Sequence, residues 1–176
     1  MLNLLFFWFR RKHPKRSSRH QQSFPVHWVI PYRLAVGRLP RKADMDELAR
    51  SNIQAVLALC SESEGQWPIN LEQRFQCHRI VIPDSHYATP LKPHQIETAV
   101  DYLHECIQRQ LPVFVHCLAG IERSPTICIA YLCRYHNYTL WESLDWVRRV
   151  HPDSLPTDQQ IQSIRGYLTS RAHRIA

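Results

Sequence analysis

The segment VFVHCLAGIERSP, residues Val113 to Pro125, constrains the fold more than any other part of this chain. It opens with a run of apolar β-formers that ends at His116, and Gly120 marks a tight turn. The following residues, 126–135, are apolar nearly all round, as in a buried helix. In a strand–loop–helix junction of this kind, the loop N–H groups and the helix N-terminus converge on one point. The segment therefore predicts an α/β domain with an anion-binding loop at the end of a central strand.

Short apolar segments and amphipathic helical segments alternate along the rest of the chain. Strands are predicted at residues 27–30, 34–37, 53–59, 77–82 and 113–116, and helices at 44–50, 93–107, 126–135, 139–150 and 157–170. The last two helices open with Thr-x-x-Glu and Thr-x-x-Gln, which are capping-box patterns. Polar residues 61–74 and 84–90 are predicted to be loops. This alternation indicates a mostly parallel central sheet flanked by helices.

The N-terminal residues differ in composition from the rest of the chain. We assign residues 1–23 to a tail and residues 24–176 to one domain, a length typical of a single domain. The tail has an apolar run at 4–9 followed by six Lys and Arg residues, whereas the remainder has 16 basic against 15 acidic residues. The tail is either a disordered terminus or a segment that makes weak contact with a membrane surface. The balanced charge of the domain disfavours nucleic acid as a partner.

The predicted anion loop also contains a nucleophile. Cys117 begins the loop, so the positive field there would favour a thiolate facing a bound phosphate. Arg123 offers a planar guanidinium that can bind two phosphate oxygens, and Ser124 can donate a hydrogen bond to the sulfur. His116 is expected to orient the loop through hydrogen bonds. The other five cysteines lack CxxC or zinc spacing and are expected to be free thiols in a reducing compartment, which indicates the cytoplasm, free or at a membrane periphery.

Taken whole, HCLAGIERS resembles the H-C-x-x-G-x-x-R-[ST] signature of the protein tyrosine phosphatase superfamily. The flanking segments HWVIPYRLAVGRLP, RIVIPD and TICIAYLCRYHNYTLWESLDWVRRVHP resemble those of the small, atypical dual-specificity phosphatases. The resemblance extends from Phe24 to the C-terminus. It implies a dual-specificity phosphatase-like fold and a phosphatase that acts on phosphoproteins.

The resemblance also implies roles for individual residues. Cys117 would form a phosphocysteine, Ser124 would assist its breakdown, and Asp84 would be the general acid. Gln160 would either position the hydrolytic water or cap its helix. No metal or cofactor is implied. The phosphate cradle would consist of Leu118, Ala119, Gly120, Ile121, Glu122 and Arg123.

Glu122 departs from the subfamily pattern, in which a small or polar residue precedes the arginine. Its carboxylate would either stand at the rim and repel polyanionic substrates or turn outward and pair with an arginine elsewhere, and we favour the second arrangement. The loop lacks lysine, which argues against a highly phosphorylated inositol headgroup as substrate. Two other functions remain open, an RNA 5′-phosphatase and a phosphate-binding module without turnover. Asp84 itself could instead be an ordinary turn aspartate.

Overall fold

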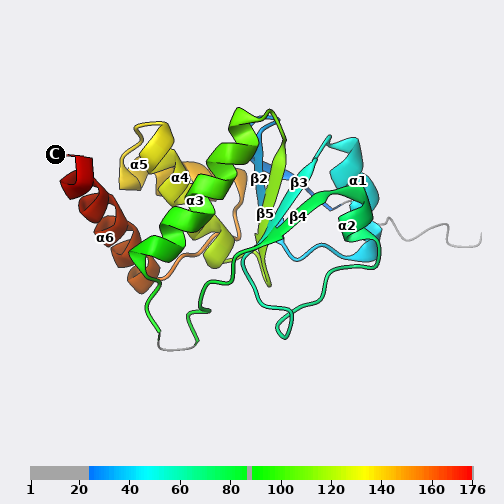
Figure 1. The fold of residues 1–176 in the computed structure, drawn as a ribbon, viewed down its shortest axis with the longest axis horizontal. Helices are drawn as coiled ribbons and strands as arrows, with labels where there is room; N and C mark the ends of the chain where they lie inside the picture. Colours follow the sequence, from blue (N-terminus) through cyan, green and yellow to red (C-terminus); the bar gives the residue numbers. More distant parts are fainter. Residues whose placement is uncertain (1–23, 87–88, 176) are drawn as a thin grey trace, which may run out of the picture.

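A five-stranded sheet forms the centre of the molecule (Figure 1). The computed structural model describes residues 24–86 and 89–175. The strand order is β1-β2-β5-β3-β4. The strands are β1 (His27–Ile30), β2 (Leu34–Arg38), β3 (Ala55–Ala58), β4 (Gln76–Arg79) and β5 (Val113–Cys117).

The sheet is parallel except at one edge. β5 lies between β2 and β3 and is parallel to both, and β3 is parallel to β4, whereas β1 is antiparallel to β2. The prediction of a mostly parallel α/β sheet is therefore confirmed. Because β2, β3 and β5 run in the same direction, their carboxyl ends meet at one edge, where ligands bind in open parallel sheets.

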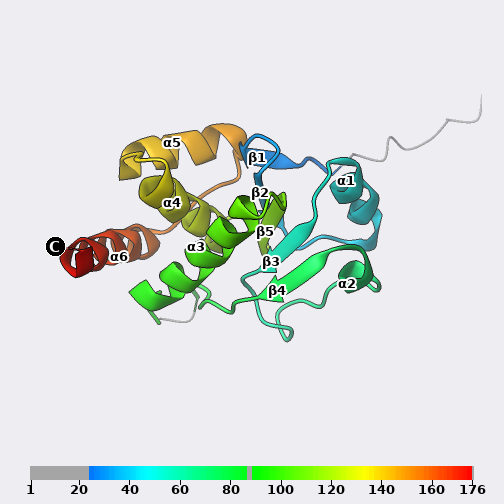
Figure 2. The same cartoon turned by 45° about the horizontal axis from the view of Figure 1, so that its top comes forward.

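Helices cover both faces of the sheet (Figures 1 and 2). One face carries a short 3₁₀ turn, η1 (Lys42–Asp44), with α1 (Met45–Arg50) and α2 (Leu71–Arg74). The other face carries the longer helices α3 (Pro93–Gln108), α4 (Arg123–Tyr135), α5 (Leu140–Val150) and α6 (Asp158–Ile175). Both layers bury apolar side chains against the sheet, so its central strands have no solvent-facing side.

Alternation along β5 shows how the two layers share one strand. Val113 and Val115 join the core formed with α3 and α4, whereas Phe114 joins the second core beneath α1 and α2. All three side chains are fully buried. A central strand buried on both faces explains why this segment is continuously apolar.

Several elements differ from the prediction by one or two residues at an end, α2 lies inside the predicted loop 61–74, and α6 ends at Ile175 and not at residue 170. Two other differences have an identifiable cause. Helix α4 begins at Arg123, three residues earlier than expected, because the N–H of Thr126 donates to the carbonyl of Glu122 and closes a first turn. Pro125 is tolerated in that turn because its missing N–H would have no helical partner there. Strand β4 ends at Arg79 and not at residue 82, since its partner β3 ends at Ala58. The predicted capping box at the start of α5 is present.

Within residues 24–86 and 89–175, no helix combines the length and apolar character needed to cross a membrane. The tail at 1–23, and with it the predicted membrane-surface contact, lies outside the described residues.

Candidate active site

The loop between β5 and α4 presents its N–H groups to one point. Outward hydrogen bonds hold its carbonyls: that of Leu118 accepts from the N–H of Leu39, that of Ile121 from the N–H of Leu155 (2.8 Å), and that of Gly120 from Nε2 of His151 (2.7 Å). In a trans peptide the following N–H points the opposite way from the carbonyl. The amides of the loop are therefore turned inward, as binding of an anion requires.

Gly120 allows this loop to lie against the end of β2. Its φ is +79°, a conformation that other residues adopt only with strain. A Cβ atom at this position would lie 2.6 Å from the backbone nitrogen of Arg38 and 2.7 Å from the carbonyl carbon of Gly37. Both atoms belong to the sheet backbone and cannot move aside, so only glycine fits.

The thiol of Cys117 lies at the base of the loop, 3% exposed. The N–H of Gly120 donates to its sulfur at 3.2 Å. The hydroxyl oxygen of Ser124 lies 3.4 Å from the sulfur and 3.1 Å from the carbonyl oxygen of Gly37, so its single proton can serve either acceptor. Both of these contacts place a hydrogen-bond donor beside the sulfur.

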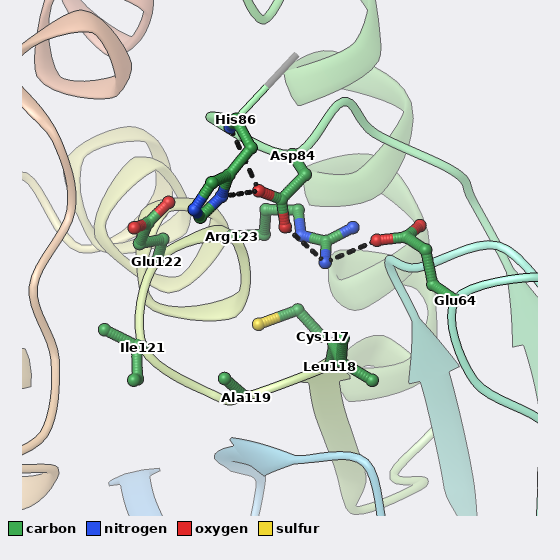
Figure 3. Close-up of a pocket in the computed structure, with 9 residues that line it drawn as sticks. All are labelled: Glu64, Asp84, His86, Cys117, Leu118, Ala119, Ile121, Glu122 and Arg123. Atoms are coloured by element: carbon green, nitrogen blue, oxygen red, sulfur yellow. Dashed lines mark hydrogen bonds and ion pairs between the residues drawn. The ribbon is translucent and has the colours of Figure 1, made fainter.

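Arg123 occupies the first turn of α4 and is 2% exposed. Its Nη2 contacts Oε1 of Glu64 and Oδ2 of Asp84, each at 2.8 Å, so that two carboxylates flank the guanidinium (Figure 3). Its Nη1 is buried and has no hydrogen-bond partner among the described residues. A buried guanidinium with an unused N–H donor is suited to binding an oxyanion.

Asp84 follows β4 on a loop that reaches the pocket from outside. One of its oxygens faces Arg123, and the other accepts from the N–H (3.1 Å) and Nδ1 (2.7 Å) of His86. Partial burial works to raise the pKa of Asp84, but the hydrogen bonds from His86 and the charge of Arg123 outweigh it and hold this pKa below its ordinary value. The contact with Asp84 in turn raises the pKa of His86. Asp84 is thus both a turn aspartate and a carboxylate facing the phosphate loop.

The expectation for Glu122 is wrong. Its carboxylate turns toward the pocket, where Oε2 accepts a hydrogen bond from the hydroxyl of Ser85 on the neighbouring loop. Ser85 comes directly after Asp84, and the backbone path brings it within reach of Glu122. This partner could not be foreseen because the contact joins loops far apart in the sequence.

His116 is fully buried beneath the loop. Its Nδ1 lies 3.0 Å from the carbonyl oxygen of Cys117, and its Nε2 accepts from Nε1–H of Trp67 at 3.3 Å. Nδ1 therefore carries the proton of a neutral ring. Burial lowers the pKa of His116 to about 4, against an opposing contribution from the carbonyl of Cys117. These contacts fit a residue that orients the loop and do not fit a general base.

Gln160 lies at the start of α6 and caps that helix. Its Oε1 accepts from the N–H of Thr157 at 2.9 Å and lies 3.4 Å from the hydroxyl of Thr126. The side chain does not line the pocket, and its contacts are those of the capping alternative.

Together these groups enclose a pocket of about 370 Å³ (Figure 3). Of the residues predicted for the site, Cys117, Asp84 and the cradle residues other than Gly120 line it directly, while Gly120, Ser124 and His116 support it from behind. The sequence analysis missed Glu64 and His86, which also line the pocket. Both belong to polar loops whose composition carries no signal of where their side chains point.

A family model described as "Dual specificity phosphatase, catalytic domain" matches residues 36–170. The mouse dual specificity protein phosphatase 14 is 34% identical over 86 residues, which cover 49% of this chain and 40% of that protein. The Arabidopsis thaliana phosphatidylglycerophosphate phosphatase PTPMT2 is 27% identical over 119 residues, covering 68% of this chain and 52% of that protein. The chain thus spans about half or less of the length of these relatives.

Solved structures share the fold. The crystal structure of Tk-PTP in its active form matches with a TM-score of 0.71 and 25% identity, covering 81% of this chain and 95% of that one.

Proposed function

The chain belongs to the dual specificity phosphatase family, and we propose that it hydrolyses phosphomonoesters through a phosphocysteine intermediate on Cys117. The observation that carries this proposal is the convergence of Cys117, the inward loop amides, Arg123 and Asp84 around one pocket. Each of these groups supplies one requirement of phosphoryl transfer: a nucleophile, donors for the phosphoryl oxygens, and an acid for the leaving oxygen.

In the first step the sulfur of Cys117 attacks phosphorus, and the bond from phosphorus to the ester oxygen breaks. The loop amides and Arg123 bind the three non-bridging oxygens, on which negative charge is spread. Asp84 gives its proton to the leaving oxygen. A bound phosphate dianion engages Arg123 and adds its own charge, and both changes raise the pKa of Asp84 from its low value in the free protein. Substrate binding thus favours the protonated acid that the step requires.

In the second step a water molecule attacks the phosphocysteine. Asp84, now a carboxylate, takes a proton from that water, and the phosphorus–sulfur bond breaks with its electron pair returning to sulfur. The hydroxyl of Ser124 can turn from Gly37 to the sulfur and stabilise the departing thiolate. Inorganic phosphate is then released.

The substrates we favour are phosphotyrosine and phosphoserine or phosphothreonine in proteins. The pocket has three carboxylates, Glu64, Asp84 and Glu122, against the single guanidinium of Arg123, which disfavours substrates with several phosphates. A single phosphomonoester next to a neutral or aromatic group suits this surface better. Nucleic acid is disfavoured for the same reason.

A phospholipid monoester is a second candidate, supported by the apolar rim of the pocket. Leu118 is 42% exposed and Ile121 38% exposed at its edge. The name of the Arabidopsis relative refers to a lipid phosphate. Exposed aliphatic side chains beside a phosphate site can bind the apolar part of such a substrate.

The test is hydrolysis of para-nitrophenyl phosphate in EDTA by the wild-type chain and by Cys117→Ser. We expect turnover by the wild type and a loss of at least roughly a thousandfold in the variant, with binding of inorganic phosphate retained. Phosphate binding without turnover by well-folded wild type would instead identify a binding module. Phosphotyrosyl and phosphothreonyl peptides, a 5′-phosphorylated RNA and phosphatidylglycerophosphate micelles, compared by kcat/KM, then separate the substrate classes.

A further inference from the structure

Two neighbouring contacts join the acid loop to the phosphate loop. Asp84 pairs with Arg123, and the next residue, Ser85, donates to Glu122, the residue before that arginine. Consecutive residues of one loop thus contact consecutive residues of the other. Figure 3 shows Asp84 above Arg123 and Glu122 at the left of the pocket, with His86 between them. Substrate binding would affect the Asp84–Arg123 contact but not the Ser85–Glu122 contact.

The contact between Asp84 and Arg123 competes with substrate binding. Nη2 of Arg123 is already shared between Asp84 and Glu64, at 2.8 Å each. A phosphoryl group with two negative charges binds the guanidinium more strongly than one carboxylate does, because planar pairing with its oxygens adds hydrogen bonds. Once Asp84 is protonated as the acid, its attraction to Arg123 falls further. During the reaction this contact therefore cannot hold the acid in place.

The contact between Ser85 and Glu122 involves no group that binds the phosphoryl oxygens. Ser85 and Glu122 interact through a hydroxyl and a carboxylate, and the contact is partly buried. The backbone of Glu122 is fixed, since its carbonyl accepts from both the N–H (3.0 Å) and the hydroxyl (2.8 Å) of Thr126. A negative side chain is also favoured at the N-terminus of a 13-residue helix such as α4. Glu122 is therefore a rigid anchor for the acid loop.

We propose that Glu122 is a positioning residue for the general acid. Through its contact with Ser85, it holds the Asp84 loop over the pocket after the substrate phosphoryl group has replaced Asp84 as the partner of Arg123. This inference rests on the proposed function, in which Asp84 protonates the leaving oxygen. It assigns a role to the pocket carboxylate that the two-step reaction itself does not use. The Glu122 carboxylate keeps its negative charge, and the hydrogen bond from Ser85 gives this side chain a role beyond the repulsion of polyanionic substrates.

The experiment compares Ser85→Ala, Glu122→Ala, the double variant and Glu122→Gln on two substrates. Phenyl phosphate has a poor leaving group and depends on the acid, whereas para-nitrophenyl phosphate depends on it little. We expect Ser85→Ala and Glu122→Ala each to lower kcat for phenyl phosphate roughly tenfold more than kcat for para-nitrophenyl phosphate. The double variant should lose no more than either single variant, because both remove the same contact.

Glu122→Gln separates the hydrogen bond from the charge. The glutamine oxygen can still accept from Ser85, so this variant should keep most of the phenyl phosphate activity. Equal losses on both substrates, or a loss in Glu122→Gln as large as in Glu122→Ala, would overturn the inference. Matched controls are Glu105→Ala on the exposed face of α3 and Ser163→Ala on α6. Neither residue lines the pocket, and both variants are expected to keep wild-type rates.

Asp84→Asn distinguishes failure of this inference from failure of the proposed function. If Asp84→Asn slows both substrates equally, the acid assignment itself is wrong. If it slows phenyl phosphate selectively while Ser85→Ala does not, only the role of Glu122 is refuted. Adding Ser85→Ala to Asp84→Asn should cause no further loss on phenyl phosphate, since there is no acid left to position.

Discussion

Stability should fall on acidification because of one buried histidine. His116 remains neutral in the folded protein, with a pKa of about 4 against an ordinary value of 6.5. In the unfolded chain it takes up a proton as the pH falls below 6.5, whereas the folded protein does so only below about 4. The stability that the neutral ring contributes is therefore complete above pH 6.5, declines as the pH falls, and is lost near pH 4.

The magnitude follows from the two pKa values. A difference of about 2.5 units at about 1.36 kcal/mol per unit gives roughly 3 kcal/mol between pH 7 and pH 4. This is a large part of the stability of an ordinary domain. Burial is the principal cause, so the effect requires that the ring stays covered by the phosphate loop and Trp67.

The assay is urea unfolding followed by circular dichroism at several pH values, for the wild type and for His116→Gln. The variant is expected to be less stable at pH 7, because it loses the fit to Trp67 and to the carbonyl of Cys117. Between pH 7 and pH 4, however, the free energy of unfolding of the variant should fall by about 3 kcal/mol less than that of the wild type. His94→Gln, an exposed position on α3, is the control and should keep the wild-type dependence.

Other titrating groups do not affect the difference between the wild type and His116→Gln. Burial also lowers the pKa of His151, but that ring titrates in both proteins and cancels from the difference. Equal pH dependence in wild type and His116→Gln would refute the argument, because it would mean that His116 gains its proton at the same pH in the folded and unfolded states.

Three further outcomes are expected. Gly120→Ala should lose about 2 kcal/mol or more of stability and nearly all activity, measured by thermal unfolding and para-nitrophenyl phosphate hydrolysis, since its Cβ would meet backbone atoms of Gly37 and Arg38 at a positive φ; a fully active variant would refute this. Glu64→Gln removes one of the two carboxylates on Arg123, so vanadate should raise its melting temperature more than that of the wild type; a smaller rise would contradict the competition between carboxylate and oxyanion. Deletion of residues 1–19 should leave para-nitrophenyl phosphate hydrolysis unchanged, and failure of the shortened chain to fold would show that the assigned domain boundary is wrong.

Much of the architecture could be predicted because its causes are local in the sequence. The strand at 113–117 is apolar on both faces, the Thr139–Glu142 box caps α5, and the alternation of strands with helices requires parallel crossovers. Boundaries were less certain: α4 begins three residues early because its first turn closes on the carbonyl of Glu122, a hydrogen bond that composition does not reveal.

The chemistry of the site divides in the same way. The sequence alone determines that Cys117 and Arg123 lie at one site. A short loop between a strand and a helix has few ways to close, and Gly120 marks its turn. Only the tertiary structure decided that Arg123 is flanked by Glu64 and Asp84, and that Glu122 binds Ser85. These contacts join loops that follow different strands, and parallel pairing of β3, β4 and β5 brings their ends to one edge of the sheet. The direction of a side chain in such a loop depends on charged groups that distant segments bring near it. The sequence of the loop itself does not show which groups these are.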